Sequence, residues 1–152
     1  MSKLTKYAQR STLMDIKVSW NGEDFEYNLF NEVAIDPDKI TKEALLQPSA
    51  YAFLSMLHKK LSNKVAELET KCKRVYAKAY VQVKNKNNPK TGRPYSDDLC
   101  KEKVILDKEY QKAEDMLNRF RANESILQTC VKAFEQRQQM IQTISANTRK
   151  EV

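Results

Sequence analysis

Residues 51–79, YAFLSMLHKKLSNKVAELETKCKRVYAKA, decide the fold, because mostly apolar side chains recur along them at alternating intervals of three and four. Side chains three and four positions apart lie on the same face of an α-helix. Four consecutive repeats of this spacing are typical of a helix that packs against another helix. The stripe consists of Tyr51, Leu54, His58, Leu61, Val65, Leu68, Cys72, Val75 and Ala79.

A second long helix is predicted from about residue 97 to about residue 146. Ser96 is a good N-cap, and the acidic pair Asp97-Asp98 suits the positive end of a helix. No proline or glycine follows residue 94, so we expect no interruption. We therefore predict an antiparallel hairpin of two long helices. The second stripe consists of Leu99, Leu106, Tyr110, Ala113, Leu117, Phe120, Leu127, Val131, Phe134 and Ile141.

The apolar surface of the two helices exceeds what one hairpin can bury, because each helix offers more than a single stripe. We therefore expect homo-oligomers that associate through the helices. The residues that suggest a wider apolar face are Phe53, Leu57, Met116, Phe120, Cys130, Phe134 and Ile144.

Two smaller elements are predicted before the long helices. Apolar residues alternate on both sides of Asn21-Gly22, which favours a β-hairpin over residues 16–30. Asp36-Pro37 is a good helix start, and we expect a short helix from there to about Gln47, ended by Pro48. The predicted fold is mainly α: a long antiparallel helical hairpin with a short N-terminal helix and an N-terminal β-hairpin. Residues 1–34 form the tail and β-hairpin, and residues 35–152 form the helical part.

Positive charge is concentrated in one stretch. The chain has 152 residues with 27 Lys or Arg and 20 Asp or Glu, a net charge of +7. Residues 71–95, KCKRVYAKAYVQVKNKNNPKTGRPY, contain eight Lys or Arg and no acid, so the other residues have 19 basic and 20 acidic side chains. A local basic block points to a polyanionic partner, whereas a diffuse charge more often serves solubility.

The basic block combines cations with aromatic rings. Lys71, Arg74 and Lys78 lie on one face of the predicted helix, and Tyr76 and Tyr80 form a pair four residues apart. Cations that contact phosphate and rings that stack on bases are typical of single-stranded DNA binding. Two alternatives stay open: the tyrosines pack in the helical core, or the block is a solvated helix end and loop. The candidate nucleic-acid-binding residues are Lys71, Arg74, Tyr76, Lys78, Tyr80, Lys84, Lys86, Lys90 and Arg93.

The sequence argues against an enzyme. His58, the one histidine, lies on the apolar stripe, and there is neither a Cys-x-x-Cys pair nor a phosphate-binding glycine motif. We therefore expect no catalytic residue, no metal site and no cofactor. The first ten residues lack the apolar core of a signal peptide, and no apolar run reaches the ~20 residues that span a bilayer. We expect a cytoplasmic protein without a membrane contact, in which Cys72, Cys100 and Cys130 are reduced thiols.

Several short motifs carry a family resemblance by their order and separation. They are Ile35-Asp36, Lys39 and Glu43-Ala44, then Lys78-Ala79, then Val104 and Asp107-Lys108, and finally Arg137, Ile141 and Ile144. Over about residues 34–150 the chain resembles the UvsY family of phage recombination mediators. That family has Lys-Ala-Arg followed by tyrosines where this chain has Lys78-Ala79-Tyr80, so the second cation is missing. The hairpin over residues 16–30 is an addition to the family pattern.

The resemblance implies a non-enzymatic accessory protein of the host cell cytoplasm. Such a protein forms a ring-like homo-oligomer, binds single-stranded DNA, and helps a RecA-like recombinase replace single-strand-binding protein. The rival interpretation is a helical scaffold or assembly protein of a phage, in which the basic loop is incidental. A sequence-specific DNA binder is a weaker alternative, because the predicted helices are far too long for a helix-turn-helix.

Overall fold

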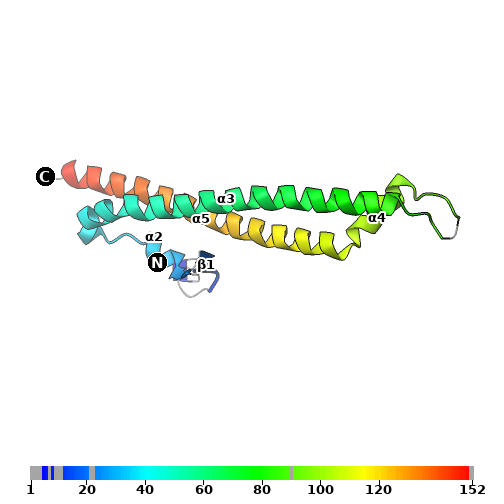
Figure 1. Ribbon diagram of the computed structural model, residues 1–152. Coiled ribbons are helices and arrows are strands. Elements are labelled where there is room, and N and C mark those ends of the chain that lie inside the picture. The colour runs from blue at the N-terminus through cyan, green and yellow to red at the C-terminus, as the bar shows by residue number, and fades with distance from the viewer. Residues whose placement is uncertain (1–4, 7, 9–11, 21–22, 90, 151–152) are drawn as a thin grey trace. The chain divides into compact units, whose positions relative to one another are not determined.

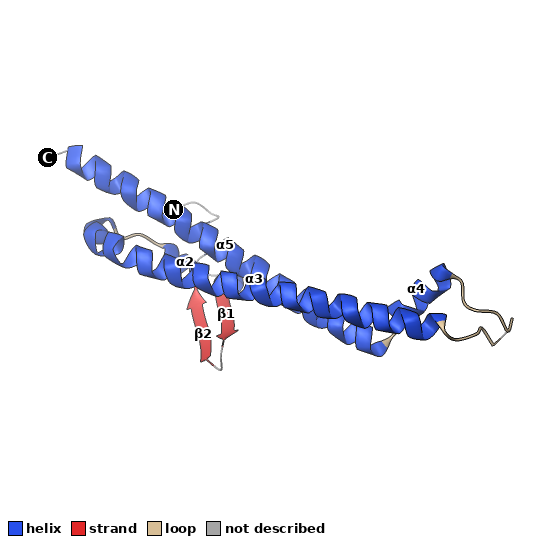
Figure 2. Cartoon of the chain, turned by 45° about the horizontal axis from the view of Figure 1, so that its top comes forward, coloured by secondary structure: helices blue, strands red, loops and turns tan. Residues whose placement is uncertain are grey.

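The computed structural model describes residues 5–6, 8, 12–20, 23–89 and 91–150. The described part is mainly helical and contains one small antiparallel sheet (Figure 2). This confirms the predicted class of long helices with an N-terminal pair of strands. The elements are η1 (Thr12–Met14), β1 (Asp15–Trp20), β2 (Glu23–Asn28), α2 (Leu29–Val33), η2 (Pro37–Lys39), α3 (Ile40–Lys84), α4 (Asp97–Ile105) and α5 (Lys108–Lys150) (Figure 1).

The chain divides into two compact units, which we describe one at a time. The terminal unit consists of Met1–Ser55 and Gln128–Val152, and the central unit consists of Met56–Leu127. Helices α3 and α5 each contribute one segment to each unit.

The strands of the terminal unit pair from Asp15 with Asn28 to Trp20 with Glu23. The predicted turn at Asn21-Gly22 lies outside the described residues. Ile16 is buried and packs in a core cluster with Leu29, Leu54, Cys130 and Phe134. The β-hairpin is thus joined to the helices by an apolar core, as an isolated two-stranded sheet requires for stability.

The alternating pattern predicts that the second strand extends through Leu29, but the strand ends at Asn28. Leu29 begins α2, because the Asn28 side chain caps this helix by accepting a hydrogen bond from the Asn31 backbone N–H at 3.2 Å. Asn is among the preferred N-cap residues. The alternation continues through Leu29 because its side chain is still directed to the core.

The prediction that Pro48 ends a short helix is wrong, since α3 runs without interruption from Ile40 to Lys84. Proline costs the helix one hydrogen bond and crowds the preceding turn. Tertiary contacts immediately before it offset this cost. The buried Gln47 side chain donates from Nε2 to the Phe134 carbonyl oxygen at 2.7 Å and accepts a hydrogen bond from Arg137. Asp36 caps the preceding turn as predicted, accepting from the Asp38 N–H at 3.1 Å.

The prediction of one uninterrupted helix from residue 97 is also wrong. Helix α4 ends at Ile105, and α5 begins at Lys108. Asp107 causes the break, because its Oδ1 accepts from the backbone N–H groups of Glu109 and Tyr110, both at 2.9 Å, as an N-cap does. Leu106, which was assigned to the apolar stripe, lies in this break and is 72% exposed.

In the central unit, α3 and α5 pack through the stripes that the heptad spacing predicts. The core contains Val65, Leu68 and Cys72 from α3 and Leu117 from α5. Partner numbers fall along α5 as they rise along α3: Ser62 contacts Glu124, Glu69 contacts Arg121, and Tyr76 contacts Tyr110. Within this unit the two segments therefore run antiparallel.

Candidate nucleic-acid interface

The net positive charge of the chain belongs to the central unit. Residues 56–127 contain 17 Lys or Arg and 10 Asp or Glu, a net of +7. The remaining residues, which form the terminal unit, contain 10 of each and are neutral overall. A polyanion is therefore attracted to the central unit by the net charge and not to the terminal unit.

The last turns of α3 present an exposed basic face. Lys71, Lys73, Arg74 and Lys78 are all exposed there, and the first, third and fourth follow the predicted spacing on one helix face. Lys78 Nζ lies 4.0 Å from Glu109 Oε2, and these side chains are 66% and 74% exposed. Such a long, solvated pair contributes little and leaves the lysine available to another anion.

Two adjoining depressions lie between α3 and α5 in the central unit, with volumes of about 250 and 180 Å³. Leu68, Val75 and Met116 give the larger one an apolar floor. Lysines from both helices line the rims. Two acidic residues, Asp107 and Glu109, also line these depressions. The basic lining residues are Lys71 and Lys112 in the larger depression and Lys78 and Lys108 in the smaller.

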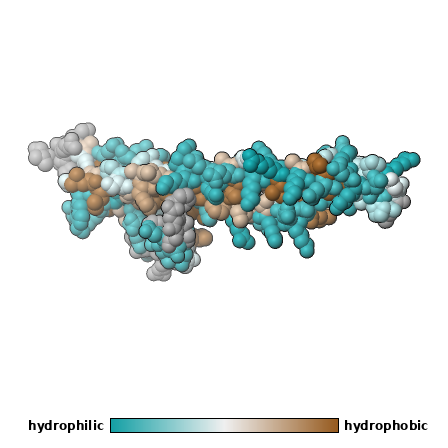
Figure 3. Space-filling model, in the orientation of Figure 1, coloured by the Kyte–Doolittle hydropathy of each residue, from teal (hydrophilic) through white to brown (hydrophobic). Residues whose placement is uncertain are grey.

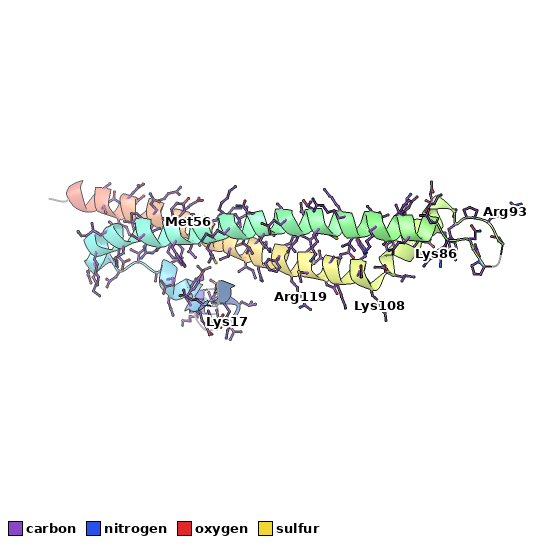
Figure 4. All side chains as sticks on the ribbon, in the orientation of Figure 1. Lys17, Met56, Lys86, Arg93, Lys108 and Arg119 are labelled. Atoms are coloured by element: carbon purple, nitrogen blue, oxygen red, sulfur yellow. The ribbon has the colours of Figure 1, made fainter. Side chains whose placement is uncertain are left out.

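Sequence reasoning missed Lys108 and Lys112, because they lie outside the acid-free stretch. The signal that could have found them is the antiparallel pairing, which places the start of α5 beside the end of α3. Figure 4 shows Lys108 and Arg119 on α5 with side chains that extend away from α3. Lys108 also borders the smaller depression together with Lys78, so basic residues of both helices lie around it.

The loop between α3 and α4 extends the basic surface beyond the helix end. Asn87 and Pro94 form an isolated antiparallel bridge, and the Asn88 N–H donates to the Arg93 carbonyl at 2.8 Å. Gly92 has a φ of 66°, a conformation that glycine adopts without steric cost. Figure 4 shows Lys86 and Arg93 in this loop, with Arg93 farther from α3. Lys90, another predicted contact, lies outside the described residues.

Lys84 and Tyr80, in contrast, are bound to one carboxylate. Lys84 Nζ lies 2.5 Å from Asp97 Oδ1, and the Tyr80 hydroxyl donates to the same oxygen at 3.0 Å. The hydrogen bonds from Lys84 and then Tyr80 lower the pKa of Asp97, and the bond to Asp97 raises the pKa of both partners. Lys84 is thus already paired with a carboxylate, so among the predicted contacts we expect it to contribute least to phosphate binding.

Tyr76 is half-buried among other aromatic rings. Its ring is stacked with Tyr80 at a centroid distance of 6.4 Å and meets Tyr110 edge-on at 5.5 Å. Burial and a hydrogen bond to Glu114 raise the pKa of Tyr110 to about 12. These contacts favour the alternative in which Tyr76 and Tyr80 pack within the helical unit. Base stacking on these two rings stays a prediction.

Most cations of the central unit's surface have no acidic partner. Figure 3 shows hydrophilic side chains over much of the visible face of α3, with apolar ones between them. Such cations can exchange their hydration for phosphate oxygens without first breaking an ion pair. In the described part of this unit, the cations for which the structure gives no ion pair are Lys59, Lys71, Lys73, Arg74, Lys86, Arg93, Lys103, Lys108, Lys112 and Arg119.

Among the described residues, no cluster of three His, Cys, Asp or Glu side chains is arranged to hold a metal ion. No helix in the described ranges combines the length and the hydrophobicity that crossing a bilayer requires. The three cysteines are buried thiols, and burial raises the pKa of Cys72 and Cys130.

Comparison with known proteins gives no relative for this arrangement. No protein-family model, no curated protein and no solved structure matches the chain.

Proposed function

We propose that the protein binds single-stranded DNA through its central unit and acts as a recombination mediator. In this role it helps a RecA-like recombinase take the place of single-strand-binding protein on the strand. The observation that carries the proposal is the segregation of charge: the entire net +7 belongs to the central unit. The sequence motifs that resemble UvsY proteins supply the step from DNA binding to mediation.

A single strand fits this surface better than a duplex. The rims of the α3–α5 depressions offer cations, and their floors offer apolar surface from Val75 and Met116. An unpaired strand can place phosphates on the rims and unstacked bases on the floor, whereas a duplex keeps its bases inside. The loop with Lys86 and Arg93 lengthens the track for the backbone.

Self-association through the helices, in a hairpin arrangement, completes the proposal. In the terminal unit, Leu45, Leu46 and Met140 are 75%, 58% and 54% exposed. A second copy that covers such surface gains hydrophobic free energy at ~25 cal/mol per Å² of buried apolar area. Several tethered central units on one strand also raise the effective concentration of each contact. Moderate affinity per protomer then becomes strong binding per oligomer.

The second candidate function is a helical scaffold or assembly protein. Tyr76 packs against Tyr80 and Tyr110, and Tyr80 donates a hydrogen bond to Asp97. These contacts favour the scaffold, because they give both tyrosines a structural role. In that case the cations keep the helix end hydrated and bind no specific partner.

One titration separates the two functions. A fluorescein-labelled oligo(dT) strand is titrated with the protein at two salt concentrations, beside a duplex of equal length. We expect the single strand to bind more tightly and its affinity to fall steeply with salt. Equal or unmeasurable binding of both nucleic acids at low salt would favour the scaffold. Displacement of single-strand-binding protein by a recombinase, with and without this protein, then tests mediation itself.

A further inference from the structure

We infer that Ile105 and Leu106, at the break between α4 and α5, contact the nucleobases of the bound single strand. This role depends on the proposed DNA binding and adds the side chains that meet the bases. Ile105 is 54% exposed and Leu106 is 72% exposed. Single exposed apolar side chains are common on protein surfaces, but two large ones in succession form a small apolar patch. Such a patch gains free energy when a ligand removes it from water.

The backbone of the break is fixed, so the apolar pair is held at the surface. The preceding residue, Val104, is fully buried, and its carbonyl oxygen accepts a hydrogen bond from the Asp107 N–H at 2.9 Å. The Gln111 side chain donates from Nε2 to the Ile105 carbonyl oxygen at 3.1 Å. A contact surface that is already ordered loses little conformational entropy when it binds.

Lysines adjoin the apolar pair. Asp107, the next residue, borders the smaller depression between α3 and α5, and Lys78 and Lys108 border it too. The Asp107 carboxylate accepts two backbone N–H groups of α5, and Glu109, the other acid there, lies 4.0 Å from Lys78. The whole central unit has a net charge of +7. Apolar surface beside lysines in a basic unit complements a strand that has anionic phosphates and bases with apolar faces.

The pair offers the bases a more accessible contact than the tyrosines of the basic block do. Tyr76 is half-buried against Tyr80 and Tyr110. Leucine and isoleucine are among the apolar side chains that proteins insert between bases. In a duplex this insertion must first unstack a base step, whereas the bases of a single strand are free to splay out. We therefore expect the pair to favour single strands through the bases, while the lysines act through phosphate.

Two fluorescein-labelled strands of equal length and charge separate these contributions: oligo(dT) and a strand of abasic deoxyribose phosphates. In anisotropy titrations, we expect the native protein to bind oligo(dT) at least tenfold more tightly. In Ile105→Gln/Leu106→Gln this ratio should fall at least fivefold, whereas the affinity for the abasic strand and its salt slope should stay unchanged.

The matched control is Met56→Gln/Ile126→Gln, which replaces two exposed apolar side chains of the same unit that border neither depression. Figure 4 shows Met56 far along α3 from Lys108. This control should keep the native ratio between the two strands. Thermal melts establish that each variant is folded, and Leu106→Gln alone is used if the double variant does not fold.

The outcomes distinguish the base contact from DNA binding itself. Equal affinity of the native protein for both strands, or a native ratio in Ile105→Gln/Leu106→Gln, would overturn the base contact while DNA binding stands. Failure of both strands to bind at low salt would remove the proposed function and the base contact with it. If the ratio is unchanged and the variant instead loses oligomeric mass, a second copy covers the break. If it instead loses binding to phosphatidylserine vesicles, a lipid surface does so, and in either case the base contact is wrong.

Discussion

Arg137 of α5 donates a hydrogen bond to the Glu43 carboxylate of α3, and its side chain is only 8% exposed in this ion pair. The same guanidinium donates to the Gln47 side chain and to the Ala34 carbonyl oxygen, the latter at 3.3 Å. Glu43 and Arg137 also belong to two of the sequence motifs on which the proposed relation to UvsY proteins rests. In this chain, therefore, those two motifs meet in one structural network of the terminal unit.

Replacement of Arg137 by Met should destabilise the protein by about 3 kcal/mol, near the lower end of the range for removing one partner of a buried ion pair. The lower end is expected because Arg137 Nε already lacks a hydrogen-bond partner among the described residues. Glu43 is 22% exposed, so Glu43→Gln should cost less. Urea denaturation followed by circular dichroism measures both free energies of unfolding. A larger loss in Glu43→Gln than in Arg137→Met would contradict this account.

The long helices and their apolar stripe could be predicted because burial repeats along them with a regular period. Leu61, Val65 and Leu68 are buried where the heptad spacing places them. The two wrong boundaries depend on single side chains that overrule local preference. The Gln47 side chain is hydrogen-bonded to the Phe134 carbonyl of α5, and α3 continues past the following Pro48. Asp107 caps a new helix where neither proline nor glycine signals a stop.

The candidate site was predicted only in part, because the sequence shows which charges are neighbours along the chain but not which charges meet across two packed helices. The acid-free stretch indicated Lys71 and Arg74, which are indeed exposed. Pairing across the helices adds Lys112 to the same depression as Lys71 and supplies Asp97 as a counter-ion for Lys84. Both relationships link residues on different helices, so no local pattern could have revealed them.

The double substitution Lys71→Ala/Arg74→Ala should reduce the salt dependence of DNA binding. For single strands, log affinity falls by about 0.7 per unit of log salt for each neutralised phosphate, so the slope should shrink by about 1.4. All base sequences should weaken alike, since phosphate contacts carry no base information. Anisotropy titrations between low and moderate salt measure the slope. The matched control is Lys42→Ala/Lys132→Ala, two exposed lysines of the terminal unit, and an equal change in that control would argue against a localised interface.

Tyr76→Ala should lower stability before it lowers affinity. The substitution removes a half-buried ring that contacts Tyr80 and Tyr110, and aromatic pairs add about 0.5–1.5 kcal/mol beyond the burial of their area. Calorimetry should therefore show a reduced melting temperature with DNA affinity within a few-fold. Tyr80→Phe is the companion change, because it keeps the ring and removes only the hydroxyl that donates to Asp97. A folded Tyr76→Ala protein with normal stability and a loss of ~1–3 kcal/mol in DNA affinity would instead show base stacking.

Asp97 should contribute a pH-dependent stability. Its pKa is lowered by the hydrogen bonds from Lys84 and Tyr80, so the folded state holds the carboxylate charged more strongly than the unfolded state does. For a lowered pKa, this contribution is fully present above the unfolded value of about 3.9 and is lost as pH falls through the folded value. Asp97→Asn should therefore melt lower than the native protein at pH 6. The difference should disappear in strong acid, and a constant difference from pH 6 to pH 2 would rule out this cause.

Charge placed on the exposed leucines of α3 should break the proposed oligomer without unfolding the protomer. Leu45 and Leu46 are 75% and 58% exposed, so Leu45→Glu/Leu46→Glu removes little buried apolar area within one chain. Exposed substitutions usually change stability by less than ~0.5 kcal/mol, and glutamate is a good helix former. At an interface between copies, in contrast, an unpaired carboxylate costs several kcal/mol. Light scattering should give a native mass that is a multiple of 17.7 kDa and a variant mass near that of one chain.

The control for this change is Gln136→Glu, which adds the same side chain at an exposed polar position of α5 and should leave the mass unchanged. The dissociated variant also tests how oligomerisation supports binding. If several central units share one strand, the variant should keep its salt slope per protomer and lose overall affinity for long oligonucleotides far more than for short ones. A native protein that is monomeric at micromolar concentration would remove the basis for this prediction, and the exposed leucines would then require another partner.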